Sequence, residues 1–288
     1  DSLGSWHEMF YVYGSLGFVF LVPWLLFAQD SPKQHNTSLL LNEQQEATKN
    51  DIVMMEIPDP LSSWEASWEA SVGLFREAPW KGFVQSKGCW AMLLAHCAKN
   101  WGLYNTLAWT PTFYYEQYGI GVRDSALLSI LPSVSGAVGG LLAGNLADAV
   151  IRNMEDKSEE ALTRVRKVFQ SIAAFGPALA LGTLASNIPE NPQTAQFFLM
   201  AAVGLQAFVA AGFDAGNQEK AGEKWAGLLY SVTTLPAVMF GTFGVWCVGE
   251  VLDATGQDWS VVFSINAFVN VLGATAFLLL YDSKREFD

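Results

Sequence analysis

The sequence predicts an all-α, polytopic membrane protein with seven transmembrane helices. The 288-residue chain contains seven apolar stretches, and each has the length at which a helix rising ~1.5 Å per residue crosses a ~30 Å hydrocarbon core. Hydrophobic residues make up 51% of the chain and charged residues only 15%. The predicted spans are Glu8–Ala28, Lys87–Tyr115, Ser125–Val150, Val168–Ser186, Gln193–Asp214, Trp225–Asp253 and Trp259–Tyr281.

Lys and Arg residues alternate between the gaps that separate these spans. One set of gaps holds fourteen of the sixteen basic residues: 29–86 with Lys87 at its edge, 151–167, 215–224 and the C-terminal tail. The other set holds only Arg123: 1–7, 116–124, 187–192 and 254–258. Because basic loops stay on the cytoplasmic or equivalent side, the pattern predicts an N-terminus outside and a C-terminus inside.

The composition excludes several classes of function. The net charge of −12 argues against a nucleic-acid partner, which requires a basic face. Cys89, Cys97 and Cys247 fall within predicted spans, so neither a disulfide framework nor a zinc spacing is expected. The three histidines are predicted outside, inside and within the membrane. They therefore assemble no catalytic triad or metal site, and we expect neither an enzyme nor a cofactor.

The chain divides into three parts. Residues 1–28 form one predicted transmembrane helix, 29–86 a long loop on the basic side, and 87–288 a region of six further spans. Within the loop, Ser-Trp-Glu-Ala at 63–66 is repeated at 67–70. Apolar residues recur there at helical spacing, which predicts an amphipathic helix. Such a helix lies in the headgroup zone or packs on the protein's own cytoplasmic face.

A glycine-rich run in the third span has no strand before it and no Gly-Lys-Ser after it, so it is not a nucleotide-binding loop. Gly136, Gly140 and Gly144 recur at steps of four, as in membrane helices that pack closely. We therefore expect this face to lie against another helix.

Lys99 lies several turns inside the second span. An ammonium in lipid costs ~2.5–3.5 kcal/mol on insertion scales, so Lys99 is expected to face a wet cavity or a partner. His96, Asn100 and Tyr104 follow one another at steps of four and share a helix face. This polar and aromatic stripe beside a cation suits a small anionic solute. The alternative is that Lys99 extends to the basic-side interface.

A second group of charges follows the third span. Asp148 is followed by Arg152 one helical turn later and by Arg166 across the loop. A carboxylate facing basic residues across a short loop is a candidate charge latch, or gate, between two conformations. The alternative is an ordinary solvated pair worth ~0–1 kcal/mol.

These residues together resemble the anion/cation symporter branch of the major facilitator superfamily, which includes vesicular glutamate, sialic acid, phosphate and plastid anion carriers. The resemblance extends from Trp6 to about Phe287 and is nearest to the plastid members. The similar motifs, in order, are Phe10-Tyr11-Val12-Tyr13-Gly14, Pro79-Trp80-Lys81, His96-Cys97-Ala98-Lys99-Asn100-Trp101, Trp109-Thr110-Pro111, Gly144 to Asp148 with Val165-Arg166-Lys167, Ala226-Gly227 and Gly241.

The resemblance implies helices six to twelve of a twelve-helix carrier, the C-terminal half of the fold. It implies an alternating-access transporter of small organic or inorganic anions, coupled to Na⁺ or H⁺, in a plastid envelope or thylakoid membrane. It also implies that Lys99 binds the substrate anion, that His96 and Asn100 line the same cavity, and that Asn217 matches a family asparagine near the cytoplasmic end of helix ten.

The chain also departs from the family pattern. Lys220 and Glu223 replace an Asp and a Pro, Thr233-Thr234 replaces a Ser-Asn pair, and the first five helices are not in the sequence. If Asp1 is where a fragment begins, a missing N-terminal half completes the transporter. If the mature polypeptide starts there, the alternative is a transport-incompetent subunit that docks in a larger membrane complex.

Overall fold

The computed structural model describes residues 11, 14–15, 17–21, 23–24 and 60–287, and it divides into two compact units, Asp1–Trp68 and Glu69–Asp288. In the first unit the described residues between 11 and 24 are helical. Most of the predicted span Glu8–Ala28, and the loop up to residue 59, lie outside the described residues. The helix α3, Pro60–Glu77, contains the Ser-Trp-Glu-Ala repeat, and the boundary between the units falls within it.

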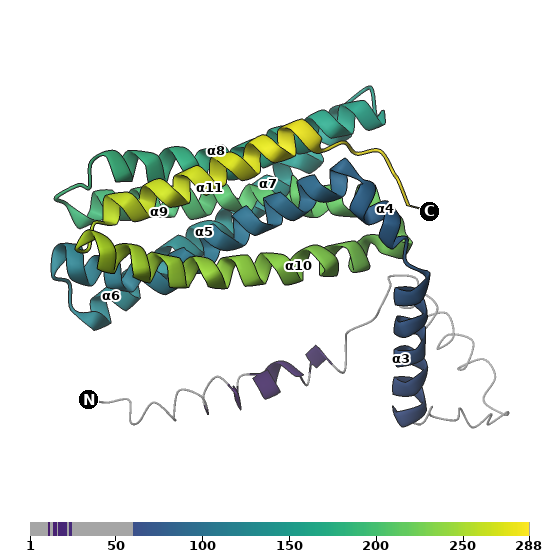
Figure 1. Cartoon of the computed structure of the whole chain (residues 1–288), viewed down its shortest axis with the longest axis horizontal. Helices are drawn as coiled ribbons and strands as arrows, with labels where there is room; N and C mark the ends of the chain where they lie inside the picture. The colour runs from purple at the N-terminus through teal and green to yellow at the C-terminus, as the bar shows by residue number, and fades with distance from the viewer. Residues whose placement is uncertain (1–10, 12–13, 16, 22, 25–59, 288) are drawn as a thin grey trace, which may run out of the picture. The chain divides into compact units, whose positions relative to one another are not determined.

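The second unit is a bundle of helices (Figure 1). Side chains cap the N-termini of four of them. The side chains of Ser86, Ser158, Asn191 and Asp258 each accept a hydrogen bond from a backbone N–H in the first turn of the helix that follows. The elements are α4 (Trp80–Gln85), α5 (Lys87–Tyr118), α6 (Val122–Leu128), α7 (Ile130–Asn153), α8 (Glu159–Ser186), α9 (Pro192–Gln206), the 3₁₀ turn η1 (Ala207–Ala210), α10 (Phe213–Thr255) and α11 (Trp259–Leu280).

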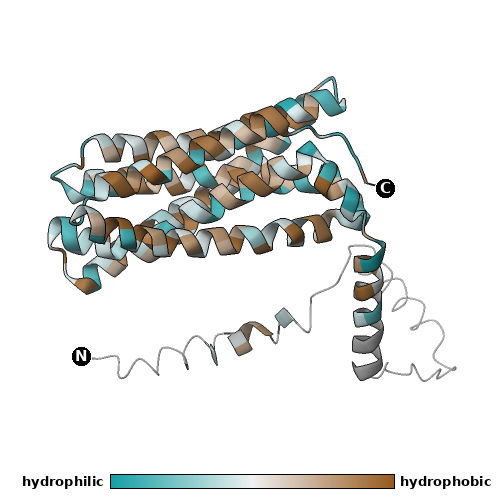
Figure 2. Cartoon of the chain, in the orientation of Figure 1, coloured by the Kyte–Doolittle hydropathy of each residue, from teal (hydrophilic) through white to brown (hydrophobic). Residues whose placement is uncertain are grey.

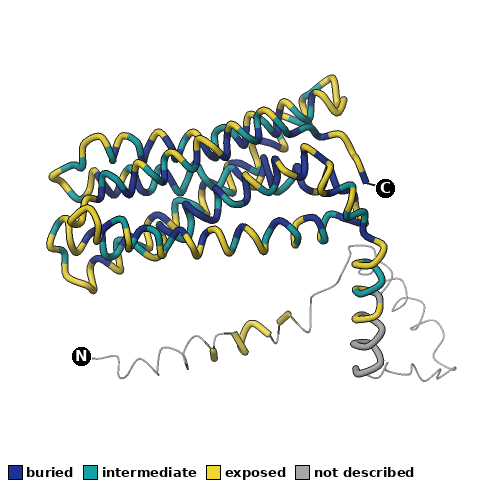
Figure 3. The backbone as a smooth tube through the Cα atoms, viewed as in Figure 1, coloured by how far each residue is buried: buried dark blue, intermediate teal, exposed yellow. Residues whose placement is uncertain are grey.

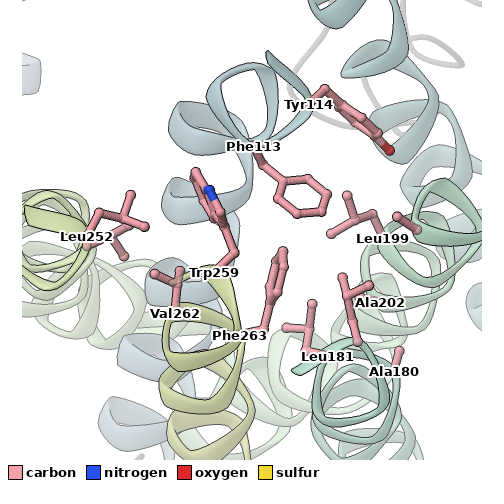
Figure 4. Packing of buried hydrophobic residues seen from close by; sticks show 13 residues of the cluster. Phe113, Tyr114, Ala180, Leu181, Leu199, Ala202, Leu252, Trp259, Val262 and Phe263 are labelled. Atoms are coloured by element: carbon pink, nitrogen blue, oxygen red, sulfur yellow. The ribbon is translucent and has the colours of Figure 1, made fainter. Parts of the chain in front are cut away.

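The helix α5 lies at the centre of this bundle. It packs against both α10 and α11, whereas α8 lies against α9 and α11, and α7 packs on α9 (Figure 1). At one end the core is aromatic: the rings of Phe113 and Phe263 meet edge to face at 5.0 Å between centroids, next to Trp259 (Figure 4). This end of the bundle is therefore tightly closed by side chains from α5, α8, α9, α10 and α11.

The outer surface of the bundle is apolar. Large aliphatic side chains such as Leu141, Leu179 and Leu279 are more than two thirds exposed, and hydrophobic residues recur along the exposed faces of the helices (Figures 2 and 3). Proteins in water rarely expose contiguous apolar patches of this kind. A lipid bilayer accounts for such a surface, because acyl chains are as apolar as leucine side chains.

Four stretches of the described residues are long and apolar enough to cross a membrane: Val122–Asn153, Glu159–Ser186, Pro192–Thr255 and Trp259–Leu280. The third, at 64 residues, covers two of the predicted spans. The second predicted span forms α5, which has 32 residues but is not among the four. The all-helical membrane architecture is confirmed, and the count of seven spans stays a prediction.

The predicted gap at 215–224 is mostly helical, and the label α10 covers two helices that meet within it at a kink. Its helical geometry is interrupted only at Gly222, where φ is 69° and ψ is 177°, a conformation that side chains other than glycine rarely adopt. Two charged residues in this stretch, Glu219 and Lys220, have partners within the protein, whereas Gln218, Glu223 and Lys224 are exposed. Lys220, for example, is completely buried and bonded to the C-terminal tail.

The glycine face of α7 is also displaced from its predicted position. Gly139 lies against the backbone of Gly204 on α9, and Gly136 lies beside Val203, but nothing lies within 4 Å of a Cβ placed at Gly144. Close packing between α7 and α9 therefore runs through Gly136 and Gly139, not along the three glycines at steps of four.

Candidate functional site

The polar stripe on α5 faces α10. His96 is buried, with its Nδ1 3.1 Å from the Thr233 hydroxyl oxygen, and its ring lies against those of Phe213 and Tyr230, with centroids 4.9 and 5.2 Å away. All three partners of His96 belong to α10. This side chain therefore joins the two helices in addition to any contact with a solute.

Further along the same face, α5 and α10 approach closely because α10 carries glycine. A Cβ added at Gly241 would lie 2.8 Å from the Tyr104 ring and 2.9 Å from the Asn100 carbonyl oxygen. Asn100 is buried and Tyr104 is partly buried. The structure thus places His96, Asn100 and Tyr104 along one helix–helix contact, in the order that their spacing predicted.

Lys99, next to this stripe on α5, also approaches α10, at Phe213 and Asp214. Its ammonium nitrogen is 3.4 Å from Asp214 Oδ1 and 5.7 Å from the centroid of the Phe213 ring. The two charged side chains are 20% and 32% exposed. The pair is thus neither dry nor freely solvated. A carboxylate at this distance offsets part of the cost of placing an ammonium inside an apolar bundle.

Lys99 also lines a cavity of ≈ 320 Å³, within the range of small-molecule sites. Gln206 lies beside it and donates a hydrogen bond of 3.3 Å to the Lys99 carbonyl oxygen. The wall is mostly apolar, with hydroxyl groups from α5 to α7. The lining residues are Lys99, Leu103, Thr106, Leu107, Ser129, Pro132, Ser133, Gly136, Val203, Gln206, Ala207 and Val209.

A second cavity, of ≈ 400 Å³, lies on the Asp214 side of the ion pair. Asn217 lines it and is itself buried; its Nδ2 donates to the Ala226 carbonyl oxygen at 3.0 Å, but its Oδ1 has no hydrogen-bond partner. An unsatisfied buried acceptor is costly, so this oxygen is available to a solute donor. Asp214, Asn217, Gln218, Ala226, Gly227 and Tyr230 line the cavity.

The predicted gating residues lie in separate places. Arg166 is buried and binds Glu219 of α10, with its Nε 3.0 Å from both carboxylate oxygens, and it also donates to the Ala211 carbonyl oxygen at 2.8 Å. Asp148 and Arg152 are exposed on α7. Neither takes part in the ion pairs found among the described residues. Arg166 thus joins α8 to α10 without them.

Sequence reasoning missed Asp214, Glu219, Tyr230 and Thr233 as members of these clusters. One signal was present for Asp214: a carboxylate at the end of one predicted span and an ammonium inside another are both costly in lipid, and such charges usually pair. Glu219 offered no comparable signal, because it falls in the predicted gap at 215–224, where a charge is not costly. The hydroxyls of Tyr230 and Thr233 carry no charge at all.

The fold and the site together define a polytopic membrane protein in which apolar, lipid-facing helices surround an ion pair flanked by two cavities. Comparison with known proteins gives the family: the Major Facilitator Superfamily model matches residues 1–241, and the chain belongs to this family. The resemblance found in the motifs is thereby confirmed.

The relatives include proteins named as plastid anion transporters. Probable anion transporter 6, chloroplastic, of Arabidopsis thaliana is 30% identical over 98% of the chain and 50% of its own length. The chloroplastic ascorbate transporter of the same plant is 28% identical over 99% of the chain and 47% of its own length. Human sialin is 28% identical over 96% of the chain and 51% of its own length. The chain thus spans about half the length of these relatives.

Proposed function

We propose that this chain forms the C-terminal half, helices six to twelve, of a secondary transporter that moves small organic or inorganic anions by alternating access. The observation that carries this proposal is the position of Lys99. Lys99 lines a cavity of ≈ 320 Å³ in an apolar bundle, and its side chain is 20% exposed. A cation in that position attracts an anion and is costly to maintain otherwise. Its neighbour Gln206 adds an amide to the cavity wall.

The names of the relatives support an anion as the solute. They include an ascorbate transporter and a sodium-dependent phosphate transport protein, both chloroplastic, from Arabidopsis thaliana. On this basis we place the protein in a plastid envelope or thylakoid membrane and assign Na⁺ or H⁺ as the coupling cation. These relatives are named as transporters, not as enzymes or structural subunits, and nothing in the described residues favours the docked-subunit alternative.

The remaining parts take their roles from this proposal. Seven helices cross the bilayer, with residues 29–86 as the cytoplasmic-side loop and its Trp-rich helix at the membrane surface. His96, Asn100, Tyr104 and Asn217 support or line the substrate path. Asp148, Arg152 and Arg166 form the gate, in which Arg166 and Glu219 hold α8 to α10 in the conformation described here.

Uptake of labelled phosphate, ascorbate and glutamate into proteoliposomes containing the full-length protein tests the proposal. Lys99→Ala is expected to lower the uptake of the transported anion ~10- to 100-fold, because a hydrogen bond to a charged group is worth ~1.5–3 kcal/mol. Lys99→Arg, which keeps the charge, should retain part of the activity. Lys157→Ala, which removes an exposed loop lysine, serves as the matched control.

Two outcomes would contradict the proposal. Uptake that is unchanged in Lys99→Ala removes this lysine from the substrate site. Failure of the folded, full-length protein to take up any of the three anions argues against transport and restores the docked-subunit alternative.

A further inference from the structure

Asp214 presents an obstacle to anion binding at Lys99. Its carboxylate oxygen lies 3.4 Å from the ammonium nitrogen, so an anion that pairs with Lys99 comes close to a second negative charge. With both groups ionised the pair carries no net charge. An anion that binds Lys99 therefore meets a like charge at close range, which is strongly unfavourable inside an apolar bundle.

The groups around Asp214 leave Lys99 as its cation. From α5, Lys99 and His96 face this region, and from α10 the phenol of Tyr230 lines the same cavity as Asp214. Arg166 of α8 is already bound to Glu219. The segment 192–210, which forms α9 and η1, contains no titratable side chain. Without a second cation nearby, an ionised Asp214 has no alternative ionic partner once Lys99 binds an anion.

The two members of the pair line different cavities. Lys99 lines the ≈ 320 Å³ cavity between α5, α7 and α9, and Asp214 lines the ≈ 400 Å³ cavity along α10. The Asp214 side chain is 32% exposed, so water reaches the carboxylate. A proton can therefore arrive at Asp214 from one side while a solute arrives at Lys99 from the other.

We propose, building on the transport function above, that Asp214 is the displaceable counter-ion of Lys99 and that its protonation accompanies anion binding. A proton from the aqueous cavity forms an O–H bond on the Asp214 carboxylate, and the ion pair with Lys99 breaks. The Lys99 ammonium keeps its three protons and pairs with the anion. Release of both ligands on the other side restores the Lys99–Asp214 pair.

The net charge of the site in its empty and loaded states makes this proposal specific. The empty site holds one ammonium and one carboxylate, and the loaded site holds one ammonium, one neutral carboxylic acid and one monovalent anion. Both states are neutral, so the loaded site moves one proton and one anion without net charge transfer. Replacing Asp214 by an uncharged residue leaves a positive empty site, and anion movement then responds to voltage.

The test uses proteoliposomes of the full-length protein with labelled ascorbate and glutamate, each of which carries one net negative charge near neutral pH. Uptake is driven either by a pH gradient of about one unit at zero potential or by a potassium–valinomycin potential without a pH gradient. For the wild-type protein we expect up to ~10-fold acceleration by the pH gradient and no response to potential. Asp214→Asn should respond to potential and not to the pH gradient.

Matched variants separate coupling from folding. Glu190→Gln removes an exposed loop carboxylate and should behave as the wild type, and Asp214→Glu should keep the response to the pH gradient. Asp214→Asn should retain exchange of labelled for unlabelled anion, which shows that it is folded. Wild-type uptake driven by potential, or a pH response that survives in Asp214→Asn, overturns the Asp214 assignment alone. Absence of wild-type uptake and exchange overturns the transport function and this proposal together.

Discussion

Two lysines lie inside the same helical unit in different environments. Lys99 is 20% exposed, has one carboxylate at 3.4 Å and lines a cavity. Lys220 is 0% exposed and has two carboxylates, those of Asp282 and Glu286, each at 2.8 Å. Its nitrogen also lies 3.3 Å from the carbonyl oxygens of Asp282 and Lys284. Lys220 has more acceptors than its three protons can serve, whereas Lys99 has capacity for a ligand.

The Lys220 cluster fastens the C-terminal tail to α10. The acceptors all come from residues 282–286, and the chain beyond them continues to Phe287, whose ring meets that of Phe83 edge to face at 4.8 Å. The side chain of Lys220 passes directly against Gly88, where an added Cβ would clash with Lys220 Cε and would force the lysine to move. The comparison teaches that the burial of a lysine does not by itself indicate a substrate site. A better indication is an ammonium that has unused hydrogen-bonding capacity on a residue that lines a cavity.

The largest expected effect comes from a variant that breaks the Lys220 cluster. Lys220→Met keeps the packing against Gly88 but leaves Asp282 and Glu286 without their cation. These carboxylates are 49% and 29% exposed and can be hydrated, so the loss comes from the tail's hydrogen bonds to the ammonium, each worth ~1.5–3 kcal/mol. We therefore expect a clear drop in thermal stability in detergent, followed by tryptophan fluorescence. The tail at 282–287 should also become accessible to proteases, because its main anchor is lost.

Lys224→Met is the matched control for that variant. Lys224 pairs with Glu77 at 3.2 Å, but the two side chains are 52% and 68% exposed, and such pairs are worth ~0–1 kcal/mol. Equal stability losses in Lys220→Met and Lys224→Met would show that the tail cluster is not what holds this end of the bundle.

A smaller effect on stability is expected for Lys99→Met. Asp214 is partly exposed and can be hydrated when its partner is removed, so the free energy of unfolding should change by no more than ~1 kcal/mol. The same thermal-unfolding measurement on Lys99→Met and Lys220→Met sharpens the comparison directly. A destabilisation by Lys99→Met as large as that of Lys220→Met would mean that Lys99 is a structural cation.

Hydropathy alone predicted much of the helical architecture. The second and seventh predicted spans match α5 and α11 within three residues at each end, although α5 is not among the four described stretches that are long and apolar enough to cross a membrane. Hydropathy marked 215–224 only as a gap between spans, whereas its polar residues lie in the two helices of α10 that meet at a kink at Gly222. Their partners lie more than 50 residues away in the sequence, as with Arg166 and Glu219 or Lys220 and the tail, and a local pattern contains no record of such contacts.

The same limit applies to the candidate site. An ammonium inside an apolar span is visible in the sequence, so Lys99 was singled out, although its role in binding stays a proposal. Asp214 is 115 residues further along the chain, and only the packing of α10 on α5 shows that the two meet. Lys220, which replaces an Asp of the family pattern, is a departure from the transporter sequence. The structure instead gives it two carboxylates and a structural position, so the substitution no longer argues against transport.

The smallest expected effect concerns the exposed carboxylate of Asp156, which takes part in none of the ion pairs found among the described residues. Asp156 accepts hydrogen bonds from the Ser158 backbone N–H at 2.8 Å and from the Ser158 hydroxyl at 2.9 Å. These two hydrogen bonds lower the pKa of the Asp156 carboxyl below its usual value, and the bond from the backbone N–H contributes more than the bond from the hydroxyl. Ser158 in turn caps α8 by accepting from the Ala161 backbone N–H, so Asp156 orients the cap.

A carboxyl whose pKa is lower in the folded state than in the unfolded state stabilises the fold above the unfolded pKa, about 3.9 for Asp. That contribution is lost as the pH falls through the lower, folded value. Hydrogen–deuterium exchange at the first turn of α8 should therefore show protection that decreases in acid in the wild-type protein but not in Asp156→Asn. The first turn of α9, capped by the uncharged Asn191 side chain, provides an internal control. The rates are corrected for intrinsic exchange before the two helix starts are compared. If the protection at both starts then depends on acid in the same way, the Asp156 charge does not stabilise the cap of α8.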